Sequence, residues 1–187
     1  TFNGMHNLAI GRGGEIYVSD TWNQVVRRFD PRTGLVTTVA GTGEKGFSGD
    51  GGQAIKAKFG GIYCVSMDLP QNRLILTDLD NRRIRAVDLV SGRVETVAGN
   101  GERGIPKDGT DARAAPLVDP RAAIADKEGR IYILERGGHA LRVRDLDGTI
   151  HTLVGTGQQG NTGDGGPGRE ATLNRSEEHT SELQSLT

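Results

Sequence analysis

Residues 39–52 read Val39-Ala40-Gly41-Thr42-Gly43-Glu44-Lys45-Gly46-Phe47-Ser48-Gly49-Asp50-Gly51-Gly52, and this stretch recurs twice along the chain. Its opening returns as Val97-Ala98-Gly99 and again as Leu153-Val154-Gly155, with a period of 56 to 58 residues. Gly43 and Gly46 keep their spacing in the later copies as Gly101 and Gly104, and as Gly157 and Gly160. One aspartate does the same (Asp50, Asp108 and Asp164). A fixed period of this length indicates one supersecondary unit copied along an array.

Each repeat contains four short apolar or alternating runs separated by turn residues, a pattern typical of antiparallel strands. Asp147-Gly148, for example, separates two such runs and is a strong hairpin signal. The only helical expectation is one turn within Gly52–Phe59. We predict strands at Asn7–Gly11, Glu15–Ser19, Val25–Asp30 and Leu35–Ala40; at Cys64–Met67, Arg73–Thr77, Ile84–Asp88 and Arg93–Ala98; and at Ala122–Ala125, Arg130–Leu134, Ala140–Asp145 and Thr149–Val154.

Four-stranded units copied in series are the blades of a β-propeller. The pattern that begins at Gly14-Glu15-Ile16-Tyr17-Val18 and ends at Gly49-Asp50-Gly51-Gly52 resembles the NHL repeat of bacterial six-bladed propellers with long glycine-rich loops. The resemblance covers residues 1–174 and implies an all-β fold. We expect three four-stranded antiparallel blades at about 2–58, 59–116 and 117–174, which is half of a six-bladed ring. The proline usual before the first strand is kept only as Pro120.

The repeat pattern stops after Asn174. Residues 175–185 match, position by position, the translation of a common sequencing-adapter oligonucleotide. We therefore treat residues 175–187 as a non-native and disordered tail, and expect the natural reading frame to continue with further blades. Two blade faces would then lack neighbours, so we expect the chain to be poorly soluble or to self-associate through these unpaired blades.

The composition sets limits on partners. Without the tail the chain has 22 Lys and Arg against 21 Asp and Glu, a near-neutral balance that argues against nucleic acid and anionic membranes as partners. No apolar run approaches the length of a membrane span. The single cysteine, Cys64, excludes an internal disulfide and is expected to be a small buried side chain.

Two sets of carboxylates recur at equivalent positions, and for both we favour a structural role. Those at the end of each second strand could bind a hard cation, or each could accept hydrogen bonds from the turn that follows. Those in the glycine-rich loops lack the spacing of a calcium loop. We therefore expect these loops to be compact turns, and an ion or ligand site is the less favoured alternative. The two sets are Asp20, Asp78 and Glu135, and Asp50, Asp108 and Asp164.

Three arginines are also equivalent, on the third strand of each repeat: Arg27, Arg85 and Arg142. They could form a basic stripe for RNA, but such sites need aromatic stacking platforms, and aromatic residues make up only 4% of the chain. We expect local ion pairs instead, with the acidic residues that end the same strands: Asp30, Asp88 and Asp145.

Strand parity places the turns after second strands and the glycine-rich loops on one side of the array, which we call the loop-rich face. Trp22 is the best single candidate for contact there, although packing over the next blade would also explain it. A ligand or protein is expected to bind at this face. The candidate residues are Trp22, Asn23, Asp80, Asn81, Arg82 and His139.

The first strands should line the central channel. At their starts stand His6 and Asn7, Tyr63 and Cys64, and Asp119 and Arg121. A weak metal hypothesis joins His6 and Asp119, with calcium or zinc as the ion.

We interpret the chain as a binding or scaffold module without a visible catalytic constellation and with no evident cofactor. The resemblance implies a periplasmic or extracellular location. The alternative is a metal-dependent propeller hydrolase similar to gluconolactonases and regucalcin, in which a divalent ion polarises a lactone carbonyl. His6, Asn7 and Asp119 do not reproduce the Glu, Asn and Asp set of that class.

Overall fold

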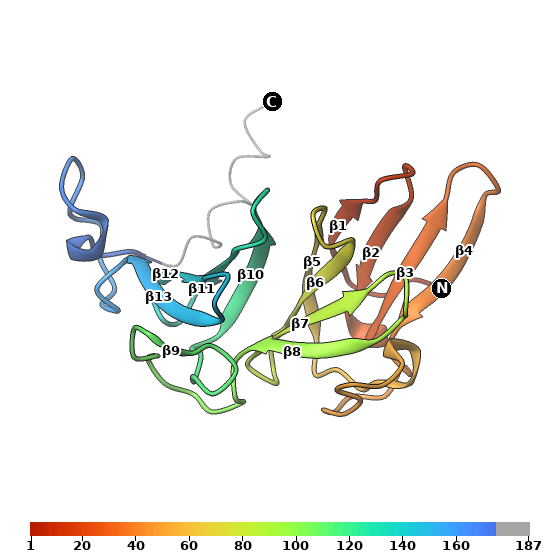
Figure 1. Ribbon diagram of the computed structural model, residues 1–187, viewed down its shortest axis with the longest axis horizontal. Coiled ribbons are helices and arrows are strands. Elements are labelled where there is room, and N and C mark those ends of the chain that lie inside the picture. Colours follow the sequence, from red (N-terminus) through yellow and green to blue (C-terminus); the bar gives the residue numbers. More distant parts are fainter. Residues whose placement is uncertain (175–187) are drawn as a thin grey trace.

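The structure is a computed structural model, and it describes residues 1–174. The expectations about residues 175–187 lie outside the described residues. Three antiparallel sheets stand side by side like blades around a common axis (Figure 1). The all-β propeller architecture predicted from the repeat is confirmed.

Each blade runs outward from its first strand to its fourth, in sequence order. The first strand of the middle blade, β5, contacts the first strands of both other blades, β1 and β10, so the three form the innermost row. The strands are β1 (Met5–Ile10), β2 (Ile16–Asp20), β3 (Val25–Asp30) and β4 (Leu35–Ala40); β5 (Ile62–Asp68), β6 (Arg73–Asp78), β7 (Arg83–Asp88) and β8 (Val94–Ala98); β10 (Pro120–Ala125), β11 (Ile131–Glu135), β12 (Ala140–Arg144) and β13 (Thr149–Val154), with the short β9 (Thr110–Asp111) beside β13. Short 3-10 turns occupy η1 (Thr21–Asn23), η2 (Ala54–Lys56) and η3 (Gly168–Glu170).

The hydrophobic core lies between blades, and the middle blade shows why. Successive side chains of a strand point to opposite faces. Leu74 and Leu76 of β6 therefore join the cluster shared with the first blade, and Ile75 between them joins the cluster shared with the third blade. All three are fully buried. A continuous apolar run is thus the signature of a blade with a neighbour on each side.

A glycine follows directly after the fourth strand of every blade, and no other residue can replace it without rearrangement. Gly41, Gly99 and Gly155 have φ of 94°, 89° and 99°. A Cβ on any of them would lie 2.2 Å from a backbone carbonyl oxygen of the turn between second and third strands. This contact, together with the left-handed φ, explains the recurring Val-Ala-Gly and Leu-Val-Gly ends.

The twelve predicted strands are all present and in the predicted order, but the first strands begin earlier than predicted. Cys64–Met67 extends to β5, and Ala122–Ala125 extends to β10. Both strands begin with a register shift against their neighbours, a β-bulge, which the alternation of side chains does not reveal. The helical turn expected within Gly52–Phe59 is the 3-10 turn η2, while β9 was not predicted.

A buried carboxylate anchors each blade at the loop-rich face. In the middle blade, Asp78 accepts a hydrogen bond from the backbone N–H of Gly60 at 2.7 Å and another from Asn81 at 2.8 Å. The guanidinium of Arg85, on the third strand, lies 3.5 Å away. Asp20 and Glu135 repeat this arrangement with Arg27 and Arg142. One side chain thereby joins the start of the first strand to the third strand.

This geometry corrects two expectations. The backbone donors to the carboxylates precede the first strand (Asn3, Gly60 and Val118) and do not belong to the turn that follows the carboxylate. The arginines Arg27, Arg85 and Arg142 pair with the carboxylates that end the second strand, not with Asp30, Asp88 and Asp145. Strand register explains the second error. Arg85 lies opposite Leu76 of β6, so Asp78 is a diagonal neighbour on the same face, whereas Asp88, three residues along the same strand, points to the opposite face.

The first and second glycine-rich loops each cross from their own blade to the outer edge of the next, and the third follows β13. We call residues 41–57, 99–115 and 155–171 the straps. Within every strap, the backbone N–H of the first glycine (Gly41, Gly99 and Gly155) donates to a carbonyl near the other end of the strap, at 2.8 to 2.9 Å, and so closes the loop. The first strap pairs with Val94 of β8, and the second pairs as β9 with β13.

The strap aspartate fastens this crossing. Asp50 accepts hydrogen bonds from Arg85 and from the Thr96 hydroxyl of the next blade, both at 2.7 Å. Asp108 accepts the backbone N–H and hydroxyl of Thr152, both at 2.8 Å. The structural interpretation of these two loop carboxylates therefore accounts for their contacts.

Equivalent carboxylates differ in pKa because their surroundings differ. Burial raises the pKa of Asp78 to about 6, outweighing its hydrogen bonds and the nearby Arg85. Burial also raises the pKa of Glu135 despite its contact with Arg142. At Asp20, burial is outweighed by hydrogen bonds from Asn23, Asn3 and Arg27, so the pKa is lowered. The Arg27 side chain is 29% exposed and that of Arg85 is 0% exposed, so solvent reaches only the first of these pairs.

We expect Asp78→Asn to remove a pH-dependent part of the free energy of unfolding. The pKa is 3.8 without burial and about 6 in the fold, so the stabilisation due to this carboxyl is complete below the lower value and is lost as pH rises through the higher one. The full effect is about 3 kcal/mol. Urea unfolding between about pH 4 and about pH 7 should show wild type losing stability relative to the variant as pH rises.

Asp20→Asn is the matched control. Because the pKa of Asp20 is lowered in the fold, its contribution is present at neutral pH and is lost as pH falls. The two variants should therefore give opposite pH slopes relative to wild type, and slopes of the same sign would contradict the assignment.

Candidate functional site

The β-bulge at the start of each first strand aims one side chain toward the channel mouth. These side chains are His6, Tyr63 and Arg121, which occupy equivalent positions in β1, β5 and β10. The His6 and Tyr63 rings lie 4.7 Å apart between centroids, and the Arg121 guanidinium carbon lies 4.0 Å over the Tyr63 ring. A bulge re-aims a side chain without breaking the rest of the ladder, and bulges are common next to functional sites. Three blades thus present one continuous row.

Trp22 completes this row from the turn between β2 and β3. Its indole meets the rings of His6 and Tyr63 edge-on, at centroid distances of 5.7 and 5.9 Å. A Cβ on Gly4 would lie 1.8 Å from the indole, so the Trp22 ring rests directly on the backbone of Gly4. The side chain is nevertheless 53% exposed. We call His6, Trp22, Tyr63 and Arg121 the mouth cluster.

A salt bridge flanks the mouth cluster. The Lys45 ammonium lies 2.6 Å from the carboxylate of Asp80, and both side chains are largely exposed. Hydrogen bonding to Asp80, with its negative charge, raises the pKa of Lys45, and Tyr63 also contributes. Of the six predicted site residues, Trp22 and Asp80 are therefore the two that the structure places beside the row of bulge residues.

The other four predicted site residues make structural contacts. The amides of Asn23 and Asn81 donate to the anchoring carboxylates Asp20 and Asp78. Arg82 and His139 occupy the last position of their turns with φ of 49° and 45°, as Gln24 does at 55°. His139 borders an apolar groove on the outer face of the third blade, away from the mouth cluster.

The metal hypothesis joins two residues with different surroundings. His6 packs against Trp22 and Tyr63. Asp119 has φ of 45°, and its carboxylate lies against the backbone of Gly137. Within residues 1–174 no group of three or more His, Cys, Asp or Glu side chains is arranged to hold a metal ion. Cys64 is buried, and burial raises the pKa of its thiol.

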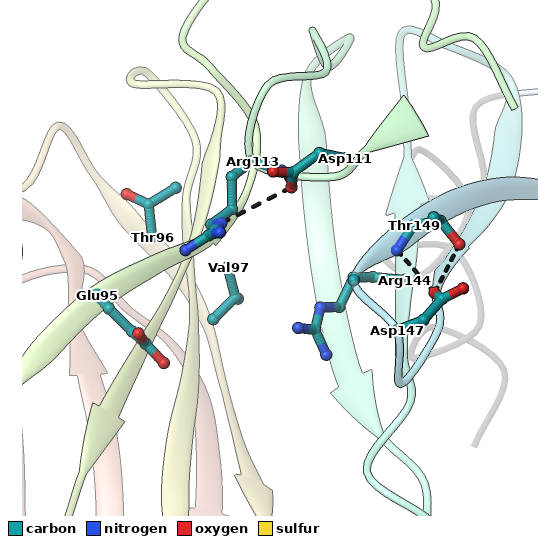
Figure 2. A pocket seen from close by; sticks show the side chains of 9 residues that line it. Glu95, Thr96, Val97, Asp111, Arg113, Arg144, Asp147 and Thr149 are labelled. Atoms are coloured by element: carbon teal, nitrogen blue, oxygen red, sulfur yellow. Dashed lines mark hydrogen bonds and ion pairs between the residues drawn. The ribbon is translucent and has the colours of Figure 1, made fainter. Parts of the chain in front are cut away.

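A second concave region lies on the outer rim between the second and third blades. Figure 2 shows Glu95, Thr96 and Val97 on one side and Arg144, Asp147 and Thr149 on the other. The ion pair of Asp111 with Arg113 lies above them, and the cavity is about 310 Å³. Its charged side chains are of both signs, and some of them already pair with one another or with the backbone.

Sequence reasoning placed Tyr63 and Arg121 at the channel mouth but selected only His6 and Asp119 from that region. Tyr63 and Arg121 could have been found by looking for equivalent positions at which the three repeats carry different residues. Three equivalent positions carry His, Tyr and Arg, while the carboxylates and arginines around them recur in every blade. Where structure demands the same residue, the repeat keeps it, so variation marks positions that the fold leaves free.

Comparison with known proteins gives one family. The family model of the teneurin NHL domain matches residues 2–167. Mouse teneurin-3 is 32% identical over 161 residues, which cover 80% of this chain and 6% of that protein. The chain therefore spans a small part of the curated relatives it matches.

Solved structures agree on the fold. A Bacteroides thetaiotaomicron protein of unknown function superposes with a TM-score of 0.71 at 22% identity, over 92% of this chain and 41% of that one. An auxiliary nutrient binding protein from Bacteroides ovatus gives a TM-score of 0.66 at 18% identity, over 94% and 42%. At these identities the likeness concerns the fold alone. Among residues 1–174, no helix is both long and apolar enough to cross a membrane.

The contact between Trp22 and Gly4 is testable by fluorescence, because Trp22 is the only tryptophan. We expect Gly4→Ala to displace the indole, to shift its emission to longer wavelength and to increase quenching by acrylamide. Gly34→Ala is the control, since Gly34 has φ of 70° against 64° for Gly4 and has no atom within 4 Å of a Cβ. Both variants should lose about 1 kcal/mol from left-handed strain. Equal spectra for the two variants would show that Trp22 does not rest on Gly4.

Proposed function

Because the chain belongs to the teneurin NHL domain family, we propose that it forms part of a non-catalytic propeller that binds a protein partner at its loop-rich face. The mouth cluster is the contact surface in this proposal. The observation that carries it is the row of His6, Tyr63 and Arg121 with the half-exposed Trp22 beside it.

The residue types suit recognition of a protein surface. Tryptophan, tyrosine and arginine are the side chains that most often dominate binding energy at protein interfaces. Trp22 and Tyr63 offer large amphipathic rings at a small cost in conformational entropy. Arg121 is held over the Tyr63 ring, which orients its guanidinium before a partner arrives. A partner that presents apolar side chains beside a carboxylate would fit this combination.

The shape favours a protein over a small molecule. The mouth cluster lies on an exposed face, where Trp22 is 53% and Met5 60% exposed. Small-molecule sites are usually concave and bury most of their ligand. The cavities of about 310 Å³ and about 330 Å³ lie on the outer strands, and the hollow of about 730 Å³ that Trp22 borders is shallow and is lined by no other residue of the mouth cluster.

The alternative, a metal-dependent lactone hydrolase, needs an oxygen-rich set of ligands that project from several first strands. The bulge positions of the described first strands carry an imidazole, a phenol and a guanidinium. No observation on residues 1–174 favours this alternative over binding.

A peptide selection tests the proposal directly. Peptides selected from a random display library against the 187-residue chain should bind at the mouth cluster and change Trp22 fluorescence on titration. We expect Trp22→Ala to weaken their binding by at least about tenfold, as for a central interface residue. Val90→Ala is the control, because Val90 is 84% exposed in the turn between β7 and β8, on the opposite face by strand parity.

Two results would overturn the proposal. Peptides whose binding survives Trp22→Ala but is lost in Val90→Ala would place recognition on the opposite face. Hydrolysis of an aldonolactone that depends on added calcium or zinc would instead establish the alternative.

A further inference from the structure

One arginine of the third blade stands where the other two blades have an apolar residue. Arg144, the last residue of β12, has the register position of Val87 in the second blade and Phe29 in the first. Val87 is 1% exposed and packs in the cluster shared with the first blade. Arg144 therefore projects from the third blade toward the second, at a position that the repeat elsewhere fills with a hydrophobic side chain.

The guanidinium of Arg144 lacks a partner. Its Nε is buried without a hydrogen-bond acceptor, and among residues 1–174 no carboxylate forms an ion pair with it. Arg85 also has an unpaired Nε, but its other nitrogens bind Asp78 and Asp50. Removing a charged group from water without giving it an acceptor costs free energy. Arg144 thus has hydrogen-bonding capacity that the described fold does not use.

Neighbouring cations add to this cost. Burial lowers the pKa of Arg144, and so do the positive charges of Arg73 and Arg113. Arg73 is held by Asp68 at 2.7 Å, and Arg113 lies 3.7 Å from Asp111. Of these three arginines, Arg144 is the one that remains available to an added carboxylate.

Arg144 lines the cavity on the outer rim between the second and third blades (Figure 2). Glu95 lines it from the second blade, and its side chain is 60% exposed and lies 3.6 Å from Arg73. Asp147 accepts both hydrogen bonds of Thr149 on its Oδ1, which leaves its Oδ2 for a further donor. These hydrogen bonds lower the pKa of Asp147, so it is charged at neutral pH.

The lining charges favour a ligand that carries both signs. A simple anion would reach Arg144 but would also meet a lining in which carboxylates outnumber cations. A simple cation would leave the guanidinium unpaired. The cations are Arg113 and Arg144, and the carboxylates are Glu95, Asp111 and Asp147.

We propose that this cavity binds a small zwitterion, with its carboxylate on Arg144 and its ammonium group toward Glu95 and Asp147. Charge-assisted hydrogen bonds to a guanidinium and to carboxylates are the strong ones in proteins. The cavity of about 310 Å³ is within the range of small-molecule sites, which begins at about 300 Å³. The site shares no residue with the mouth cluster, so it is a second site and not part of the proposed protein interface.

NMR of the Arg144 Nε–H group in the 187-residue chain tests the site. The probes are ω-amino acids from glycine to aminohexanoate, which differ in the distance between their charges. The controls for each probe are the carboxylic acid and the alkylammonium ion of the same length. We expect at least one amino acid to shift the Nε–H resonance at a concentration about tenfold lower than either control, because it satisfies both charges.

Arg144→Val assigns this resonance and tests what the arginine does. The second blade carries Val87 at the same position, so the variant should fold. It should lose zwitterion binding, followed through the backbone amide of Gly148, while its midpoint of urea unfolding stays equal or rises because an unpaired charge is gone. Arg103→Val is the control, an exposed arginine of the second strap that does not line the cavity, and it should bind as wild type does.

Glu95→Gln separates the two halves of the ligand. It should weaken binding of the amino acid and should not weaken binding of the matched carboxylic acid, because Glu95 faces the ammonium group only. Equal loss for both probes would contradict this orientation.

Three results would overturn the proposal. They are an amino acid that binds no better than its matched carboxylic acid, binding that survives Arg144→Val, and the absence of a shift with every probe. A fall in the urea midpoint of Arg144→Val would then assign a structural role to the arginine. Trp22→Ala should leave the Arg144 shifts unchanged, so this proposal and the one for the mouth cluster fail independently.

Discussion

The buried carboxylate at the end of each second strand is the constraint on which the blades depend. Asp20, Asp78 and Glu135 each receive a backbone N–H from the segment before the first strand and a guanidinium from the third strand. Without this side chain, a buried arginine would lose its counter-charge and a backbone donor its acceptor, both of which are costly. The first strand is thereby held in the position where its bulge faces the channel mouth.

The straps extend the same principle from one blade to the next. Arg85 binds the anchoring carboxylate of its own blade and also Asp50 from the strap of the preceding blade. Phe47 of that strap lies against the same guanidinium, at 4.9 Å from its ring centroid. A blade is therefore complete only when its predecessor is folded, and stability in this array depends on nearest-neighbour junctions.

Much of this fold could be predicted from the sequence, because the repeat forces each local feature to appear three times. Strand order, turn positions and the 3-10 turn in the first strap followed from the alternation of side chains and the placement of glycine. Three features were beyond that reasoning. The bulges leave no trace in alternation, β9 is held by its partner strand and not by its own sequence, and the partner of Arg85 depends on register. Of the six predicted site residues, Trp22 and Asp80 lie beside the row of bulge residues, and their binding role stays a prediction. Tyr63 and Arg121 were passed over because they do not repeat.

The β-bulge in each first strand leaves one position per blade where the side chain can vary. One residue per blade lies outside the ladder and outside the core, so its identity can change without disturbing either. The common scaffold thus carries three different side chains at this position, those of His6, Tyr63 and Arg121. Their order around the axis follows the order of the blades in the sequence. Duplication of a blade followed by substitution of its bulge residue would add one more contact side chain. The binding surface could therefore change without a change in the fold. The residues that hold the fold together are therefore different from the residues that can set what it binds.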